Sequence, residues 1–326
     1  MNHVDATSTL VEGVYLGERY DLEAFYSRYF EPHADRVRLR SPKEIDNPEA
    51  VRFALTWYPA ADAFTPYPNL KLACSIAAGV DSIVGCPSLP PEAYVTRVQD
   101  DNQADLMAGF AAWHVIWHHR NMGFYLKNQA QGIWKHQNFD IAPSPRNYTV
   151  GLLGYGLMGK AIGRAIAAMG FPVVAAVRNA PEDEQHPGIR FEIGDDAVMR
   201  TAAQSQTLVN VLPLTAATKG ILNAELFAAM PPGARLIQLG RGEHLVDEDL
   251  DAALNSGRIG GASLDVFHTE PLPSDHPWWK DERILITPHQ ASDSSRRLMA
   301  EQVVQAACDV AAGRKPRNTV DRTIGY

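Results

Sequence analysis

The feature that most constrains the fold of this chain is a glycine-rich turn between an apolar run and an amphipathic segment, within residues 148–178. The stretch YTVGLLGYGLMGKAIGRAIAAMGFPVVAAVR predicts a strand, a turn, a helix and a second strand, within the roughly thirty residues that a βαβ unit needs. Further strand-like runs occur, most of them separated by helical segments, at residues 207–214, 234–240, 261–267 and 283–289. This alternation predicts a parallel sheet with helices on both faces, the doubly wound α/β arrangement.

The amino-terminal third alternates short apolar runs with turn signals. Buried strands are predicted at residues 51–59 and 70–83, each followed by Pro or Gly. Apolar residues at helical spacing predict a long helix at 103–126, and a last helix is expected at 294–312. With 326 residues, the chain is long enough for two domains with substantial cores.

Composition and charge argue against several classes of function. Apolar residues make up 45% of the chain and charged residues 21%, the balance of a soluble globular protein. The formal net charge of −8, without a long run of one sign, disfavours nucleic-acid binding, which needs a concentrated basic surface. The three cysteines indicate no disulfide framework, and no apolar stretch is long enough to span a membrane. Because the amino terminus does not resemble a signal peptide, we expect a cytoplasmic protein.

The glycine-rich turn, GYGLMG at residues 154–159, has the G-x-G-x-x-G spacing typical of a dinucleotide-binding turn. The first glycine permits a tight turn, the second lets a pyrophosphate approach the backbone, and the third lets the helix pack closely on the strand. The amino terminus of the helix also favours negative charge. The residues expected to contact the cofactor here are Gly154, Gly156, Leu157, Met158 and Gly159.

The end of the next predicted strand bears on the choice of cofactor. An acidic residue there would hold the ribose 2′-hydroxyl of NAD, but the strand VVAAV ends in Val177, Arg178 and Asn179, without a carboxylate. The guanidinium of Arg178 suits the geometry of a 2′-phosphate, although an exposed Arg at a strand end is also common without such a role. We therefore expect NADP to be preferred, with NAD as the second choice.

Three polar residues of the second half each follow a predicted strand. Arg241 lies between two glycines, Glu270 lies in the turn HTEPLP, and His289 ends the run RILITPH. Ligands bind at the carboxyl ends of strands in such sheets. Reduction of a 2-keto acid needs a cation to hold the carboxylate and polarise the carbonyl, an acid to protonate the alkoxide, and a group that keeps this acid charged. Arg241, His289 and Glu270 would supply these in turn, whereas each alone would be an ordinary loop or turn residue.

Taken together, these motifs resemble the D-2-hydroxyacid dehydrogenase family over residues 150–290. That family is marked by an Arg-Gly pair, a DVF-x-x-EPL segment and a TPH segment in this order. Here they stand at residues 240–242, 265–272 and 287–289. Three ordered motifs after the glycine turn make the resemblance specific, while the amino-terminal third fits more loosely.

The resemblance implies a domain organisation. It predicts two Rossmann-like doubly wound parallel-sheet domains, of which the substrate-binding domain is discontinuous. Residues 1–112 and 290–326 would form this substrate-binding domain, and residues 113–289 the dinucleotide-binding domain. A homodimer formed through the helix at 103–126 and the arm that follows is implied as well.

The resemblance also implies further contacts. The segment IAAGVDSI resembles the family's substrate-carboxylate loop, so the backbone amides of Ala78, Gly79 and Val80 would hold the carboxylate. Further cofactor contacts are implied for Leu212, Pro213, Thr218 and Asp265. Thr218 would contact the pyrophosphate, and Asp265 would be the partner of the nicotinamide carboxamide.

Within the family, the segments LPLT and PLPSDHPWW and the closing DRTIGY are similar to the glyoxylate/hydroxypyruvate reductases of bacteria. This similarity implies NAD(P)H-dependent reduction of glyoxylate or hydroxypyruvate to the D-2-hydroxy acid. Trp57 matches an aromatic residue that walls a small substrate pocket in that subgroup, and a strand aromatic packed in the core is an equal alternative. Gln238 and Gln290 depart from the family pattern, where Asn and a small apolar residue are usual, so we expect them to affect substrate preference.

Two other functions stay open. Another D-2-hydroxyacid dehydrogenase, such as one of the phosphoglycerate type, would share the motifs, and a non-catalytic dinucleotide-sensing protein related to corepressors would share the fold. The complete trio favours chemistry. His114, His118 and His119 lie on the helix predicted at 103–126, and a spacing of four can bind zinc. Neighbouring tryptophans indicate packing instead, so no metal site is expected.

Overall fold

The computed structural model describes residues 10–137, 143–181 and 186–326, which form two compact units. The first, here called the terminal unit, contains the described residues up to Asp100 together with Ser294–Tyr326. The second, the central unit, contains those of Asp101–Asp293. The two ends of the chain therefore share one unit. The first division falls before the helix that begins at Asp101, rather than at 112/113, because this helix packs on the central sheet.

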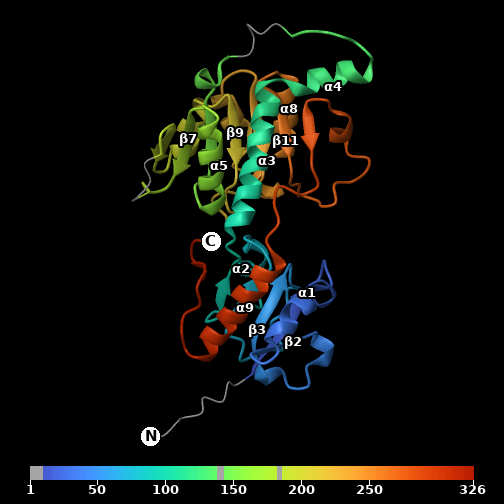
Figure 1. Ribbon diagram of the computed structural model, residues 1–326, viewed down its shortest axis with the longest axis vertical. Helices are drawn as coiled ribbons and strands as arrows, with labels where there is room; N and C mark the ends of the chain where they lie inside the picture. Colours follow the sequence, from blue (N-terminus) through green and yellow to red (C-terminus); the bar gives the residue numbers. More distant parts are fainter. Residues whose placement is uncertain (1–9, 138–142, 182–185) are drawn as a thin grey trace. The chain divides into compact units, whose positions relative to one another are not determined.

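The terminal unit is built on five parallel strands in the order β2-β1-β3-β4-β5. Its strands are β1 (Val11–Gly17), β2 (Val37–Arg40), β3 (Val51–Trp57), β4 (Leu72–Ser75) and β5 (Tyr94–Thr96), and its helices are α1 (Leu22–Phe30), α2 (Asp81–Val84) and α9 (Arg296–Ala311). Phe53 and Leu55 pack with α1 and α9 on one face of the sheet, and Ala54 packs with α2 on the other. Figure 1 shows α1 and α9 beside β3. Side chains thus alternate between two cores, as expected for a parallel strand covered on both faces.

The strands predicted at 51–59 and 70–83 are shorter in the structure. β4 ends at Ser75, whose hydroxyl donates to the carbonyl oxygen of Gly79 (2.7 Å) and accepts from the amide of Ala77 (3.1 Å). These local bonds turn the chain away from the sheet, so residues 76–80 form a loop before α2. β3 ends at Trp57, because the next residue, Tyr58, has a φ of 45°, outside the strand region.

The central unit is built on seven parallel strands in the order β12-β11-β10-β9-β6-β7-β8. Its strands are β6 (Val150–Leu153), β7 (Val173–Val177), β8 (Ile189–Ile193), β9 (Thr207–Asn210), β10 (Ala234–Gln238), β11 (Ile259–Leu264) and β12 (Ile284–Ile286). Its helices are α3 (Asp101–His119), α4 (Met122–Ala130), α5 (Leu157–Ala168), α6 (Ala197–Ala203), α7 (Ala224–Ala229) and α8 (Asp247–Asn255). The strand order reverses between β6 and β9, and doubly wound sheets bind their ligands at the carboxyl ends beside such a reversal.

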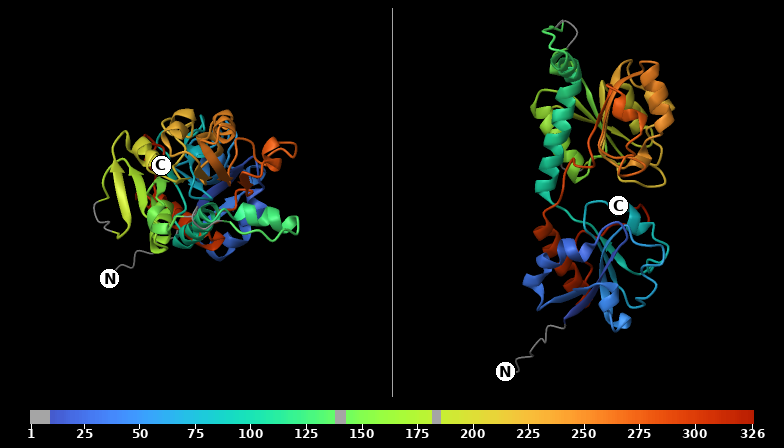
Figure 2. Two further views of the ribbon diagram at one scale, coloured as in Figure 1. Left: turned by 90° about the horizontal axis from the view of Figure 1, so that it is seen from above. Right: turned by 90° about the vertical axis from the view of Figure 1, so that its right-hand side faces the viewer.

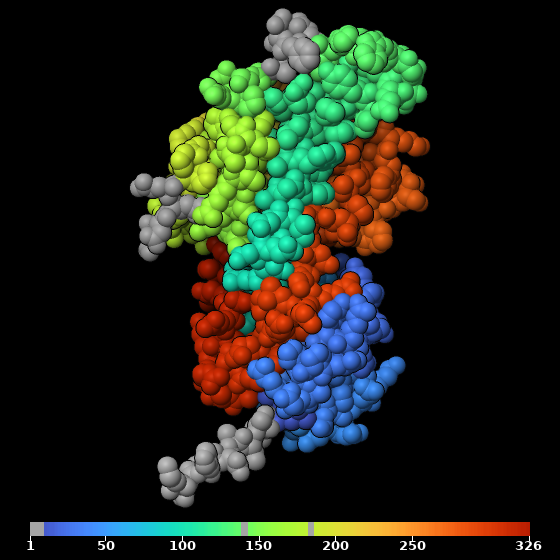
Figure 3. Space-filling view, viewed as in Figure 1, coloured from blue at the N-terminus to red at the C-terminus, as the bar shows by residue number. Residues whose placement is uncertain are grey.

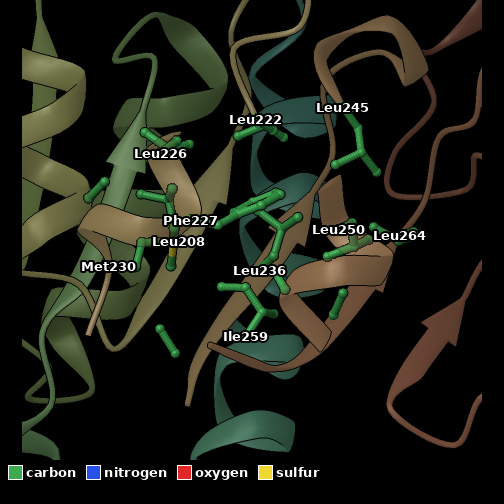
Figure 4. Packing of buried hydrophobic residues seen from close by; sticks show 14 of the residues in the cluster. Leu208, Leu222, Leu226, Phe227, Met230, Leu236, Leu245, Leu250, Ile259 and Leu264 are labelled. Atoms are coloured by element: carbon green, nitrogen blue, oxygen red, sulfur yellow. The ribbon is translucent and has the colours of Figure 1, made fainter. Parts of the chain in front are cut away.

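Helices cover both faces of the central sheet (Figure 2). On one face α3 and α5 pack against the strands through residues such as Val115 and Ile162. On the other face α6, α7 and α8 pack on a core that includes Phe227 and Leu236 (Figure 4). Leu236 and Ile237, adjacent in β10, belong to opposite cores, as expected for a strand buried on both faces. The two parallel α/β sheets confirm the predicted fold class.

The long helix predicted at 103–126 is in fact two helices. α3 ends at His119, and α4 begins at Met122. Between them Asn121 has a φ of 49°, a left-handed conformation that asparagine tolerates better than most residues. Within the described part of the chain, none of the helices combines the length and the apolar character of a membrane span.

Candidate active site

The glycine-rich turn joins β6 to α5, and each of its three glycines has a different structural role. Gly154 has a φ of 97°, which residues with a side chain rarely adopt. A Cβ on Gly159 would collide with the carbonyl group of Gly154, so the helix and the turn pack without room for a methyl group. A Cβ on Gly156 would meet no described atom within 4 Å. The packing of the described residues leaves this position open, as the approach of a ligand requires.

The start of α5 suits a negatively charged group. Gly156 is its N-cap, and within the described residues no side chain caps the first amides. The turn lies beside the loop after β9, since a Cβ on Gly154 would lie 3.1 Å from the backbone of Val211. Leu212 and Pro213 follow in this loop and are half-buried. Uncapped amides at a helix start, beside a glycine with open space, fit the pyrophosphate of a dinucleotide.

Two other residues expected at the cofactor differ in their surroundings. Arg178 directly follows β7, the neighbour of β6, and its side chain is exposed. Thr218 is engaged within its own loop, where its hydroxyl donates to the carbonyl oxygen of Pro213 (2.7 Å) and accepts from the amide of Thr215 (2.9 Å). Thr218 therefore shapes the loop after β9, and its contact with a pyrophosphate stays a prediction.

Arg241, Glu270 and His289 follow three neighbouring strands, β10, β11 and β12. Because these strands are parallel, their carboxyl ends lie along the same edge of the sheet. Nδ1 of His289 lies 2.9 Å from Oε2 of Glu270. The charge of Arg241 also acts on the Glu270 carboxylate. The structure thus brings the three predicted residues to one edge of the central sheet.

Glu270 is held as a carboxylate. Burial, the largest single effect, raises its pKa. Hydrogen bonds from His289 and from the amide of Phe267 (3.0 Å), together with the charges of His289 and Arg241, outweigh burial and lower the pKa below its ordinary value. An ionised carboxylate only accepts hydrogen bonds, so Nδ1 of His289 carries a proton and Nε2 remains for other partners.

The backbone at His289 is strained, with a φ of 55°. A non-glycine residue in this region costs on the order of 1–3 kcal/mol and persists only where its surroundings enforce it. Asp265, 1% exposed, provides such surroundings. Its Oδ1 accepts from the hydroxyl of Thr287 (2.6 Å) and the amide of Gln290 (2.9 Å), and its Oδ2 accepts from the amide of Ala291 (2.9 Å). Asp265 therefore holds the turn that carries His289, while its contact with a carboxamide stays a prediction.

The two glycines beside Arg241 are required by packing. A Cβ on Gly240 would lie 2.8 Å from the His244 ring and 3.0 Å from the Asn210 amide, and a Cβ on Gly242 would collide with the backbone of Phe267. The two glycines thus make room for buried neighbours of the loop that carries Arg241. Neither His244 nor Asn210 was predicted. For Asn210, the available signal was a polar residue at the end of the apolar strand TLVN.

In the terminal unit, the predicted carboxylate loop follows β4. Among the described residues, the amides of Ala78, Gly79 and Val80 donate to no acceptor of the chain, and successive amides of this kind suit an anion. Trp57 is half-buried and packs on the core beneath α1 and α9. This packing favours the core alternative for Trp57, and its contact with a substrate stays a prediction.

Two of the three histidines of α3 form hydrogen bonds with the central sheet. Nδ1 of His114 and Nε2 of His118 each lie 2.8 Å from Oγ of Ser263 in β11. Burial lowers the pKa of His114 to about 4 and that of His118 to about 3, so both rings are neutral. Nε2 of His119 lies 2.8 Å from the carbonyl oxygen of Pro143. Within the described ranges, no group of three or more His, Cys, Asp or Glu could hold a metal ion.

Comparison with known proteins agrees with these features. Residues 112–291 match the family model described as D-isomer specific 2-hydroxyacid dehydrogenase, NAD binding domain. The glyoxylate/hydroxypyruvate reductase A of Serratia proteamaculans (strain 568) is 35% identical over 297 residues, which cover 89% of this chain and 92% of that protein.

Solved structures give the same result. A D-isomer specific 2-hydroxyacid dehydrogenase from Xanthobacter autotrophicus Py2, in complex with NADPH and MES, is 33% identical, with a TM-score of 0.88 over 97% of this chain and 100% of that chain. An NADPH-dependent glyoxylate/hydroxypyruvate reductase from Sinorhizobium meliloti, in complex with NADP and sulfate, is 27% identical, with a TM-score of 0.86 over 97% and 100%.

The family predicted from the ordered motifs is thereby confirmed. The match covers the glycine turn and the loops after β10 and β11, and it reaches past His289 in the loop after β12. The chain is an NAD(P)-dependent oxidoreductase and belongs to the family of D-isomer specific 2-hydroxyacid dehydrogenases.

Proposed function

We propose that this chain reduces glyoxylate or hydroxypyruvate to the D-2-hydroxy acid, with NADPH as the hydride donor. The observation that carries the proposal is the His289–Glu270 pair, 2.9 Å apart, on the same sheet edge as Arg241. The Serratia relative is named for both substrates, and the Xanthobacter and Sinorhizobium structures hold NADPH or NADP.

The three side chains have different tasks. Arg241, a permanent cation, binds the substrate carboxylate and stabilises the negative charge that develops on the keto oxygen. His289 donates its Nε2 proton to that oxygen, because its Nδ1 is engaged by Glu270. Glu270, ionised through its lowered pKa, stabilises the charged form of His289 before the transfer. NADPH, when bound, supplies the hydride to the keto carbon.

The cofactor would lie at the carboxyl ends of β6 and β9. The turn at residues 154–159 and the amides at the start of α5 would hold the pyrophosphate, with Leu212 and Pro213 on the opposite side. Arg178 would pair with the 2′-phosphate, which gives NADPH preference over NADH. In the terminal unit, the amides of residues 78–80 would hold the substrate carboxylate. The terminal unit would thus be the substrate-binding domain, and the central unit the dinucleotide-binding domain.

We also propose that two copies of the chain associate through α3, α4 and the segment that follows α4. Trp113 is 50% exposed, Leu126 is 53% exposed and Trp134 is 91% exposed. Figure 3 shows α3 and α4 at the surface of the central unit. Exposed large apolar side chains are often found at interaction surfaces. A monomer for Trp134→Glu and a dimer for the parent in sedimentation analysis would support this, and a parent monomer would contradict it. The cytoplasmic location stays a prediction.

Steady-state oxidation of NADPH with a panel of 2-keto acids tests the function. We expect the highest kcat/KM with glyoxylate or hydroxypyruvate, and a loss in Arg241→Ala through both KM and kcat. Preference for 3-phosphohydroxypyruvate would favour the phosphoglycerate-type alternative. Tight binding of NADPH without turnover of any 2-keto acid would overturn the proposal and favour a dinucleotide-sensing protein.

A further inference from the structure

The backbone of Arg241 is held on both sides by buried side chains. Nε2 of Gln238 donates to the Arg241 carbonyl oxygen (2.8 Å), and Nδ1 of His244 accepts from the Arg241 amide (2.9 Å). Gln238 and His244 are both 0% exposed. The Arg241 carbonyl oxygen accepts in addition from the backbone amide of His244 (3.1 Å), so both hydrogen-bonding groups of this residue have a buried side chain among their partners.

The same side chains connect Arg241 with the loop after β9. Asn210 and Gln238 are direct partners in the register of β9 and β10, and Nδ2 of Asn210 donates to Oε1 of Gln238 (2.8 Å). Oδ1 of Asn210 accepts from the amide of Leu212 (3.3 Å). By a second route, Nε2 of His244 lies 3.3 Å from the carbonyl oxygen of Pro213. Two hydrogen-bonded routes thus join Arg241 to Leu212 and Pro213.

The protonation state of His244 follows from its partners. Since its Nδ1 accepts from the Arg241 amide, the ring proton lies on Nε2 and is donated to the Pro213 carbonyl. Burial also lowers the pKa of His244, so the ring is neutral. A neutral ring can accept at one nitrogen and donate at the other, which is what this position between two loops requires.

Packing alone does not explain these three side chains. Buried polar groups cost free energy unless they are hydrogen-bonded, and apolar residues of similar volume would fill the same space without this cost. The bonds of this group end on one another, on the backbone of residues 240–241, or on the loop after β9. What they determine is the position of the Arg241 backbone relative to that loop.

We propose that Gln238 and His244 are positioning residues, which direct the side chain of Arg241 toward the substrate and couple it to the loop that borders the cofactor. This inference rests on the proposed role of Arg241 as the substrate-binding cation. Gln238, which departs from the usual Asn of the family, would affect catalysis through Arg241 rather than through contact with the substrate.

A double-mutant cycle in the NADPH-bound enzyme tests the proposal. Gln238→Leu and His244→Leu each remove a side-chain bond to the Arg241 backbone. Each should lower kcat/KM for the keto acid about 10- to 100-fold, since small displacements of a catalytic group have effects of this size. In an Arg241→Ala background the same changes should have less than about a twofold effect, because the group that they position is gone. His244→Asn, whose Oδ1 can replace Nδ1 as the acceptor, should restore most of the loss.

Controls separate positioning from general damage. Ser205→Ala removes a comparable buried bond, from Oγ to the Thr201 carbonyl oxygen (2.6 Å) in α6, and should lower the Tm without changing kcat/KM. An equal loss for Gln238→Leu in both backgrounds would overturn the proposal, and so would no loss in the parent. If Gln238→Leu or His244→Leu fails to fold, Gln238→Asn, whose side chain is one methylene shorter and so withdraws the amide from the Arg241 carbonyl oxygen, carries the same cycle with the same expected loss. Full activity of Arg241→Ala alone would instead refute the proposed role of Arg241.

Discussion

Replacing Gly156 and Gly159 by alanine, one at a time, should separate folding from cofactor binding within one turn. A Cβ on Gly159 would collide with the carbonyl group of Gly154, so α5 and the turn must move apart. Overpacking of this kind costs about 1–3 kcal/mol, which lowers the Tm of a unit of this size by roughly 2–4 °C per kcal/mol. Gly159→Ala should therefore lower the Tm of the free protein and also weaken the binding of NADPH.

Gly156→Ala should behave differently, because its methyl group would meet no described atom within 4 Å and its φ of −77° is open to alanine. The change of N-cap costs at most about 1 kcal/mol. The methyl group would, however, occupy the space through which a pyrophosphate approaches the first amides of α5. Loss of one charge-assisted hydrogen bond, about 1.5–3 kcal/mol, corresponds to at least about a tenfold weaker Kd for NADPH.

Thermal unfolding of the free protein and a fluorescence titration with NADPH measure the two effects separately. Gly109→Ala, in α3, is a matched control, since its Cβ also meets no described atom within 4 Å and its Kd for NADPH should equal that of the parent. If Gly156→Ala binds NADPH as tightly as the parent, the pyrophosphate does not approach this residue. If it lowers the Tm as much as Gly159→Ala, position 156 is not open.

Three further predictions concern other parts of the central unit. Arg178→Ala should raise the Kd for NADPH about tenfold and leave that for NADH unchanged, because only NADPH carries the 2′-phosphate that a guanidinium binds; equal effects on both cofactors would contradict this. Glu270→Gln should move the alkaline limb of the kcat/KM profile for reduction to lower pH, because a carboxylate whose pKa is lowered stays ionised and favours its charged histidine partner; an unchanged profile would refute that role. Ser263→Ala should lower the free energy of unfolding by roughly 1–3 kcal/mol for each of His114 and His118, because each ring loses a buried hydrogen-bond partner. Urea denaturation measures this loss, and an unchanged free energy of unfolding would show that water replaces the hydroxyl.

The candidate site could be predicted to the extent that it depends on local sequence. The glycine turn could be identified because a strand, a turn and a helix follow one another within a few residues. Arg241, Glu270 and His289 could be assigned to one edge because each follows a strand, and parallel strands end at a common edge. The 2.9 Å bond between Glu270 and His289 depends on the paths of two loops, which no sequence pattern describes.

Some boundaries were wrong for a related reason. The strand predicted at 70–83 stops at Ser75 because one hydroxyl bonds to the backbone of residues 77 and 79. The helix predicted at 103–126 breaks at Asn121, although the apolar spacing continues across it. Hydrophobic periodicity shows which face is buried, but it does not show where a side-chain bond or a left-handed residue interrupts an element.

The sequence by itself determined the doubly wound fold, the family and the edge of the sheet on which the polar residues lie. Only the tertiary structure decided which buried side chains hold the backbone of Arg241. Asn210 and Gln238 are 28 residues apart in the sequence, and each ends a strand. They meet because the register of β9 and β10 makes them partners. Register arises from hydrogen bonds between strands distant in sequence. Whether a polar residue at a strand end contacts a ligand or holds another residue from within the core therefore depends on strand pairing, which the sequence of neither strand determines alone.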